Sequence, residues 1–173
     1  MDIWLIILLA VIGTYLLILI VNIIFVLSFY SIMKKHNRAI QIILKTKYDS
    51  LKDLVKKLDE KWNININEET RHLLDEAGHL LEEKEFIKHC DDIKRKLSYI
   101  TSYLFALCED DERVLEDNDY ILIKENVSQL DNVYRSNVIM YNADVLGFNY
   151  WVRFLPFRYL WLLFRIKLKD FIS

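Results

Sequence analysis

The feature that most constrains this chain is a run of 28 residues, Ile3 to Tyr30, that contains no charged side chain. Only Thr14, Asn22 and Ser28 interrupt its apolar character. As a helix the run would extend ~42 Å at ~1.5 Å per residue, whereas ~20 apolar residues cross a hydrocarbon core ~30 Å thick. The run therefore predicts one membrane-spanning helix with length to spare for tilt.

The flanking residues favour an uncleaved signal anchor over a signal peptide, which has a basic start, a short apolar stretch and a small-residue cleavage site. Only Asp2 is charged before the run, and all 23 Lys and Arg follow it. By the positive-inside rule we expect the N-terminus outside the cell membrane and the C-terminal domain in the cytoplasm. The nearest basic residues are Lys34, Lys35, Arg38, Lys45 and Lys47.

Asn22 has two interpretations within the apolar run. It could form a helix–helix contact, because polar side chains hydrogen bond across packed helices in membranes. The preferred interpretation is a single tolerated polar residue near the inner leaflet.

The composition of the remaining 143 residues predicts long helices. They carry 23 basic and 24 acidic side chains (25 in the chain, less Asp2), so they offer no basic face for a nucleic acid. Cys90 and Cys108 lack the spacing of a CxxC motif or a zinc site and are expected to be reduced thiols. The chain has three Gly and one Pro, and so few helix breakers favour an all-α fold.

Apolar residues recur at three- and four-residue steps in three stretches, and each stretch predicts an amphipathic helix. Because each apolar stripe must be buried against another, an antiparallel bundle is the simplest arrangement. Assembly into a homo-oligomeric coiled coil is the alternative. The first stripe is Ile40, Leu44, Tyr48, Leu51, Val55, Leu58 and Trp62; the second is Leu73, Ala77, Leu80, Ile87, Cys90, Ile93, Leu97, Ile100, Leu104 and Leu107; the third is Tyr120, Ile123, Val127, Leu130, Tyr134, Val138, Tyr141 and Val145.

Breaks in these patterns predict where the helices begin and end. The first helix should continue from the membrane to about Lys61, and Asn67 is expected to cap the second. Lys84 falls at a core position, so a bend or break is expected at residues 82–86. Residues 109–119 are expected to form a loop, with Asp117, Asn118 or Asp119 capping the third helix.

We therefore predict three regions in an all-α fold. Residues 1–30 form the transmembrane anchor, and residues 31–147 form a cytoplasmic bundle of three main helices. Residues 148–173 form an aromatic and basic segment that packs on the bundle or rests at the membrane interface.

The C-terminal segment, residues 148–173, mixes aromatic and basic side chains, as membrane interfaces favour. Its arginines make a full membrane span expensive, and Pro156 is expected to kink or start a helix. Trp151, Phe154, Phe157, Trp161 and Phe164 recur at steps of 3, 3, 4 and 3 and would share one helical face. The candidate interaction or membrane-interface residues are Trp151, Arg153, Phe157, Arg158 and Trp161.

No sequence motif indicates catalysis. A Gly-rich phosphate loop, a GxSxG elbow and an HExxH zinc motif are all missing from the sequence. Glu69-x-x-His72 and Glu76-x-x-His79 have the spacing found in di-iron bundles, but those sites draw the motif from two helices. Here both lie on one predicted helix, where a solvated charged face is the preferred interpretation. We expect no enzymatic activity, no metal and no cofactor.

Three stretches resemble the LemA family of bacterial membrane-anchored helical proteins. Residues 44–55 resemble the pattern L-x-x-R-x-D-L-I-P-N-L-V, residues 134–142 resemble Y-N-x-x-V-x-x-Y-N, and residues 152–157 parallel I-x-x-L-F-G-F. They occur in the family's order and spacing behind an N-terminal anchor. Departures at Lys52, Asp131, Arg135 and Asn149 suggest a divergent member. The resemblance implies a long-helix bundle on the cytoplasmic side of one span, and no particular reaction.

The sequence thus predicts a non-enzymatic, single-span scaffold or interaction protein of the cell envelope. Its expected partners are the lipid bilayer and either another protein or a second copy of the chain, and no nucleic acid. The alternative is a membrane-active protein, lytic or membrane-remodelling, that acts through residues 148–173.

Overall fold

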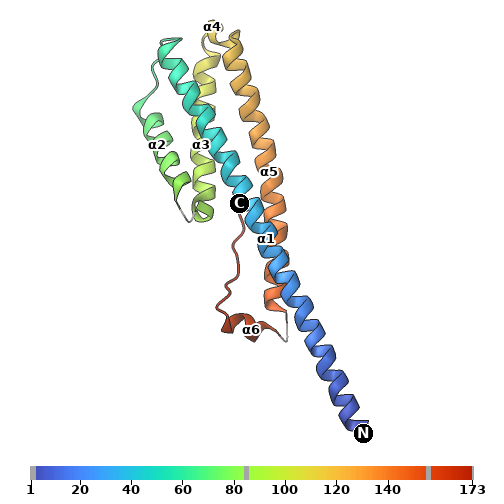
Figure 1. The fold of residues 1–173 in the computed structure, drawn as a ribbon. Coiled ribbons are helices and arrows are strands. Elements are labelled where there is room, and N and C mark those ends of the chain that lie inside the picture. Colours follow the sequence, from blue (N-terminus) through green and yellow to red (C-terminus); the bar gives the residue numbers. More distant parts are fainter. Residues whose placement is uncertain (1–2, 84–85, 155–156, 173) are drawn as a thin grey trace. The chain divides into compact units, whose positions relative to one another are not determined.

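The structure, a computed structural model, describes residues 3–83, 86–154 and 157–172. The described residues are almost entirely helical and contain no strand, which confirms the all-α prediction for this part of the chain. In chain order the helices are α1 (Ile3–Glu60), α2 (Glu68–Glu82), α3 (Phe86–Glu109), α4 (Glu112–Leu115), α5 (Asn118–Arg153) and α6 (Arg158–Leu163) (Figure 1). Pro156, where a kink was expected, lies outside the described residues.

The chain divides into two compact units. The anchor unit comprises Met1–His36 and Met140–Phe171, and the bundle unit comprises Asn37–Ile139 with the last two residues. α1 and α5 each contribute to both units. The division differs from the expected regions, since the boundary placed after residue 147 falls within α5 and the C-terminal segment groups with the apolar N-terminal run.

In the bundle unit, most of the first stripe and most of the third stripe up to Val138 lie in the core as predicted. Leu51, Leu54 and Leu58 of α1 are fully buried, as are Tyr120 and Val127 of α5. A fully buried leucine is worth about 1.5–3 kcal/mol relative to an exposed one. Burial of these stripes therefore stabilises the bundle unit.

The second stripe is displaced by one residue at several positions. α2 buries Leu74 and Leu81, whereas the predicted Leu73 and Leu80 are half-buried. These leucines occur as adjacent pairs, so either member satisfies the same helical spacing, and only packing decides which one faces the core. In α3, similarly, Phe86 and Cys108 are buried in place of the predicted Ile87 and Leu107.

The predicted breaks are confirmed with one correction. Asn67 caps α2, because its side-chain oxygen accepts the N–H of Thr70 at 2.9 Å. α2 ends at Glu82, inside the expected interval, although Lys84 itself lies outside the described residues. The expectation that residues 109–119 form only a loop is wrong, since they contain α4, which Asp111 caps.

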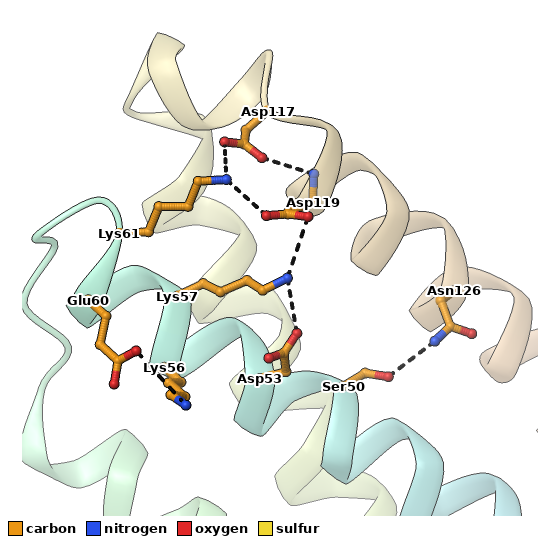
Figure 2. A network of polar contacts seen from close by, with 9 residues as sticks. All are labelled: Ser50, Asp53, Lys56, Lys57, Glu60, Lys61, Asp117, Asp119 and Asn126. Atoms are coloured by element: carbon orange, nitrogen blue, oxygen red, sulfur yellow. Dashed lines mark hydrogen bonds and ion pairs between the residues drawn. The ribbon is translucent and has the colours of Figure 1, made fainter.

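Charged side chains link the end of α1 to the start of α5 in the bundle unit (Figure 2). The Lys61 ammonium lies 2.7 Å from Asp117 and 2.9 Å from Asp119, and Lys57 lies 3.7 Å from Asp119. Asp117 also accepts the N–H of Asp119 at 2.9 Å, as expected of a helix cap. The hydrogen bond from Lys61 is the main reason that the pKa values of both carboxyl groups lie below the usual aspartate value.

Replacing Leu54 with alanine should destabilise the bundle unit by ~2–5 kcal/mol, because it removes a fully buried side chain and leaves a cavity. The free energy of unfolding of the full chain in a neutral detergent, from denaturant titration followed by circular dichroism, measures this. Ile42→Ala is the matched control on the same helix, where the side chain is 65% exposed. Equal effects of the two substitutions would contradict the assigned core.

Replacing Lys61 with methionine should lower stability at neutral pH and have a smaller effect in acid. Carboxylates with a lowered pKa stabilise the fold above the ordinary aspartate pKa of 3.8, and this contribution is lost as the pH falls through the lowered values. Denaturation midpoints measured from neutral pH to below 3.8 test the prediction. Lys56→Met is the control, since Lys56 contacts only Glu60, at 4.0 Å, among the residues drawn in Figure 2. A pH-independent effect of Lys61→Met would refute the assignment.

Candidate functional site

The five candidate residues of the C-terminal segment all lie in the anchor unit. Trp151 and Arg153 belong to the last turn of α5, Phe157 precedes α6, and Arg158 and Trp161 belong to α6. Phe157 and Trp161 are buried, Trp151 is half-buried, and both arginines are exposed. The structure therefore separates the five into aromatic anchors and solvent-accessible cations.

Asn22 is the polar centre of the anchor unit. Its amide nitrogen donates to the carbonyl oxygen of Trp151 at 3.1 Å, and its amide oxygen accepts the indole N–H of Trp161 at 2.9 Å. The side chain is buried, at 1% exposure. The preferred interpretation of Asn22 as a solitary tolerated residue is thus wrong, and the helix-contact interpretation is correct. The signal available in the sequence was one amide in an apolar run, together with tryptophans elsewhere that need an acceptor.

Aromatic contacts extend from Asn22 in both directions along α1. The rings of Phe25 and Trp151 stack with centroids 4.6 Å apart and planes at 1°, and Tyr15 lies 5.2 Å from Phe157. Such pairs contribute ~0.5–1.5 kcal/mol beyond the area they bury. Val26, Phe148, Val152 and Trp161 form a buried cluster in the same unit, against which Trp151 also packs. The C-terminal segment is therefore packed on the apolar half of α1 within the anchor unit.

Gly147 allows this close packing of α5 on α1. A Cβ atom at this position would lie 2.6 Å from the ring of Phe29, which is well inside van der Waals contact. Any larger residue here would push the ring or the helix aside.

The chain after α6 turns back toward α5 through two local features. Arg165 has a positive φ of 54°, and the N–H groups of Arg165 and Ile166 bond to the carbonyls of Leu162 and Trp161 at 3.0 Å each. This is the Schellman arrangement that ends a helix. Asn149 then exchanges two hydrogen bonds of 2.9 Å with the backbone of Lys169, so the returning segment is fixed at both ends.

A cavity of about 360 Å³ lies where α5, α6 and the returning segment meet. Among the described residues, the charged ones that line it are Arg153 and Arg158, and the other described lining residues are apolar. Three of the five candidate residues, Arg153, Arg158 and Trp161, thus share one site. The lining residues are Val152, Arg153, Arg158, Trp161, Leu162, Ile166 and Leu168.

The anchor unit also contains a half-buried acid–base pair. His36 Nε2 lies 3.6 Å from the carboxylate of Asp144. Burial raises the pKa of Asp144, and the nearby His36 opposes that rise.

The thiols of the bundle unit are poorly suited to nucleophilic chemistry. Burial raises the pKa of Cys90 to about 11 and that of Cys108 to about 12, which keeps both protonated at neutral pH. The Cys90 sulfur lies 3.6 Å from the hydroxyl of Tyr134. Sequence reasoning identified Cys90 as core and missed this polar contact.

The two ExxH motifs do not converge on one point. Glu76 pairs with Lys96 at 2.7 Å and lies 3.5 Å from the exposed His72. Among residues 3–83, 86–154 and 157–172, no three His, Cys, Asp or Glu side chains are grouped as a metal site would need.

Lys47 is a residue whose role the sequence did not reveal. It was counted with the basic residues near the membrane, yet its side chain is only 4% exposed and its ammonium lies 2.7 Å from Asp131. Both residues belong to the bundle unit, where the pair joins α1 to α5. The Asp131 side chain is 49% exposed, so loss of the pair would leave the buried Lys47 charge without compensation.

Comparison with known proteins gives no relative. No protein-family model matches the chain, and neither a curated protein nor a solved structure is found to be similar to it.

Removing the amide of Asn22 should weaken attachment of the C-terminal segment. Asn22→Leu leaves the buried indole N–H of Trp161 without an acceptor, at a cost of ~1–3 kcal/mol. We expect faster tryptic cleavage after Arg158, Arg165 and Lys167 in the full chain in detergent. Thr14→Val is the control, since Thr14 bonds only within its own helix.

The double variant Asn22→Leu with Trp161→Phe removes donor and acceptor together. Its tryptic cleavage should be accelerated by less than the sum of the effects of the two single variants, because no buried donor is left unpaired. Strict additivity would contradict a direct bond between the two side chains.

Proposed function

We propose that this chain is a divergent, LemA-like, non-enzymatic protein that anchors a helical bundle to the cytoplasmic face of the cell membrane and presents it as a scaffold for other proteins. The observation that carries the proposal is that α1 has an exposed apolar N-terminal half and a C-terminal half that belongs to the bundle core. Every residue from Ile3 to Ile18 is exposed and almost all are apolar, whereas the same helix contributes Leu51, Leu54 and Leu58 to the bundle core.

The exposed half of α1 supports a membrane anchor. By length and composition, α1 is the one described helix long and apolar enough to cross a membrane. An exposed apolar surface of this extent is rare on a monomer in water. A helix satisfies its own backbone hydrogen bonds and is therefore stable in lipid.

The length of the apolar run and the distribution of charge support a particular depth of α1 in the bilayer and a particular side for the bundle. From Ile3 to Asn22 the chain has 20 residues, ~30 Å of helix, which equals the thickness of a hydrocarbon core. At this depth Phe157, which contacts Tyr15, lies inside the leaflet. The exposed side chains of Arg153 and Arg158 are long enough to extend toward the leaflet edge, whereas an arginine at the bilayer centre costs ~2.5–3.5 kcal/mol or more. The basic residues that follow the span favour the cytoplasmic side for the bundle.

Two departures from the LemA patterns support a divergent member. Lys47 occupies the position of the family's Arg, and Asp131 occupies one where the family usually has Arg. In this chain the two side chains pair at 2.7 Å, so the acid at position 131 meets a lysine that keeps the positive charge of the family's Arg. The matched apolar positions Leu44, Leu51 and Leu54 are buried, as core positions of a shared fold would be.

The scaffold surface is best sought on α5. Leu122 and Val133 are 68% and 48% exposed, and eleven residues, or about three turns, separate them on one helical face. The bundle unit also exposes Ile139. Apolar side chains that recur on one exposed face favour contact with a protein partner or a second copy of the chain.

A membrane-active function is the second candidate, and exposed apolar residues around α6 favour it. Tyr159, Leu162, Leu163 and Phe164 are 60–79% exposed. Residues 145–173 fused behind a soluble carrier should leave host viability unchanged if the segment only anchors the protein. Loss of viability that Tyr159→Ser with Leu163→Ser reverses would support the membrane-active function instead.

The proposed orientation predicts that a C-terminal reporter active only outside the cytoplasm stays silent, while a reporter active only in the cytoplasm gives signal. Several lysines placed before Ile3 should weaken or invert this result, because they remove the charge asymmetry across the span. Strong activity of the outside reporter on the unmodified chain would overturn the orientation.

A partner test uses the full chain, solubilised from membranes, as bait. Leu122→Asp with Val133→Asp should abolish capture of a specific partner or self-association. Glu125→Lys, which changes another exposed residue of α5, should have little effect. Identical capture by all three proteins would argue against this surface.

A further inference from the structure

We propose that the cavity bounded by α5, α6 and the returning segment binds the phosphate group of an anionic phospholipid, with Arg153 and Arg158 as the cationic ligands. The inference rests on the proposed membrane anchoring, because that anchoring sets the position of the cavity relative to the lipid headgroups. It assigns a specific lipid site to a segment for which the proposed function requires only general contact with the bilayer.

The charge of the cavity selects an anion. Arg153 and Arg158 line it, and none of the other described lining residues is acidic. In the bundle unit, three of the five arginines, Arg71, Arg95 and Arg113, each lie 2.6–2.7 Å from an aspartate. Among the residues that the structure describes, no such ion pair is recorded for Arg153 or Arg158. Guanidinium groups match phosphate oxygens in geometry and charge, often through two parallel hydrogen bonds.

The remaining walls favour a lipid over a soluble phosphate compound. Val152, Trp161, Ile166 and Leu168 give the cavity an apolar floor and side. Leu162 lines the cavity and is 60% exposed, so an apolar surface leads outward from the two arginines. A phospholipid presents the same sequence of a charged phosphate followed by acyl chains.

The site is held in shape before any ligand binds. Trp161 is fixed by its hydrogen bond to Asn22, and Ile166 by the turn that ends α6. Asn149 holds the backbone of Lys169, next to Leu168, at 2.9 Å. A cavity of about 360 Å³ accepts a glycerophosphate group, and preorganised walls lower the entropy lost on binding.

At the proposed depth the cavity lies at the inner side of the leaflet edge, since Trp161 bonds to Asn22 and Phe157 contacts Tyr15. The long arginine side chains can extend from there toward the lipid phosphates. Trp151 and Trp161 bond to Asn22, which ends the stretch of α1 that matches the hydrocarbon core in length. Arg153 and Arg158 lie between these tryptophans in the sequence. Anionic lipids are enriched in the cytoplasmic leaflet, where they attract basic protein segments.

The test measures lipid binding to the full chain in a neutral detergent by native mass spectrometry. Dioleoyl phosphatidylglycerol is the anionic probe and dioleoyl phosphatidylcholine the neutral one. We expect one phosphatidylglycerol to bind preferentially, and Arg153→Gln with Arg158→Gln to weaken that binding ~10-fold or more, as loss of two charge-assisted contacts implies. Both side chains are exposed, so the variant should keep the wild-type melting temperature.

The matched control is Arg165→Gln with Lys167→Gln. It removes two positive charges from the same segment at positions that do not line the cavity, and it should reduce affinity by less than ~3-fold. An equal loss in the two double variants would indicate diffuse attraction and overturn the site.

Two measurements on the unmodified chain also test the proposal. Equal binding of the two lipids, or displacement of phosphatidylglycerol by millimolar inorganic phosphate, would overturn it. Because binding is measured in detergent, its result is independent of membrane targeting. A chain that selects phosphatidylglycerol but is absent from the membrane fraction would refute the proposed anchoring and leave the anion site in place.

Discussion

The anchor unit depends on one requirement: a buried amide in apolar surroundings must have hydrogen-bond partners. Without them the polar group of Asn22 would cost ~1–3 kcal/mol or more. Both partners come from the C-terminal segment, through the carbonyl of Trp151 and the indole of Trp161. These two bonds determine which part of α5 and which face of α6 meet α1.

Aromatic packing follows from that alignment. With Trp151 fixed beside Asn22, its ring can stack on Phe25 one turn away along α1, at a centroid distance of 4.6 Å. Phe157 reaches Tyr15 in the opposite direction. The hydrogen bonds give the aromatic packing its register.

The bundle unit is held together differently, by apolar stripes with charged pairs between helices. Its core leucines and isoleucines are fully buried, and the Lys47–Asp131 pair joins α1 to α5. The exposed pairs of Figure 2 add little individually. Their value lies in fixing which residues of the α1 end meet the α5 start.

The sequence by itself determined the helices, the long apolar half of α1 and most of the bundle core, because helical periodicity and the lack of charge are local properties. It also identified the cap at Asn67 and the break after Glu82. The tertiary structure alone decided between Leu73 and Leu74, paired Lys47 with Asp131, and joined Asn22 to Trp161 across 139 residues of chain. Spacing reports which residues share a helical face, but only packing of distant segments decides what that face meets.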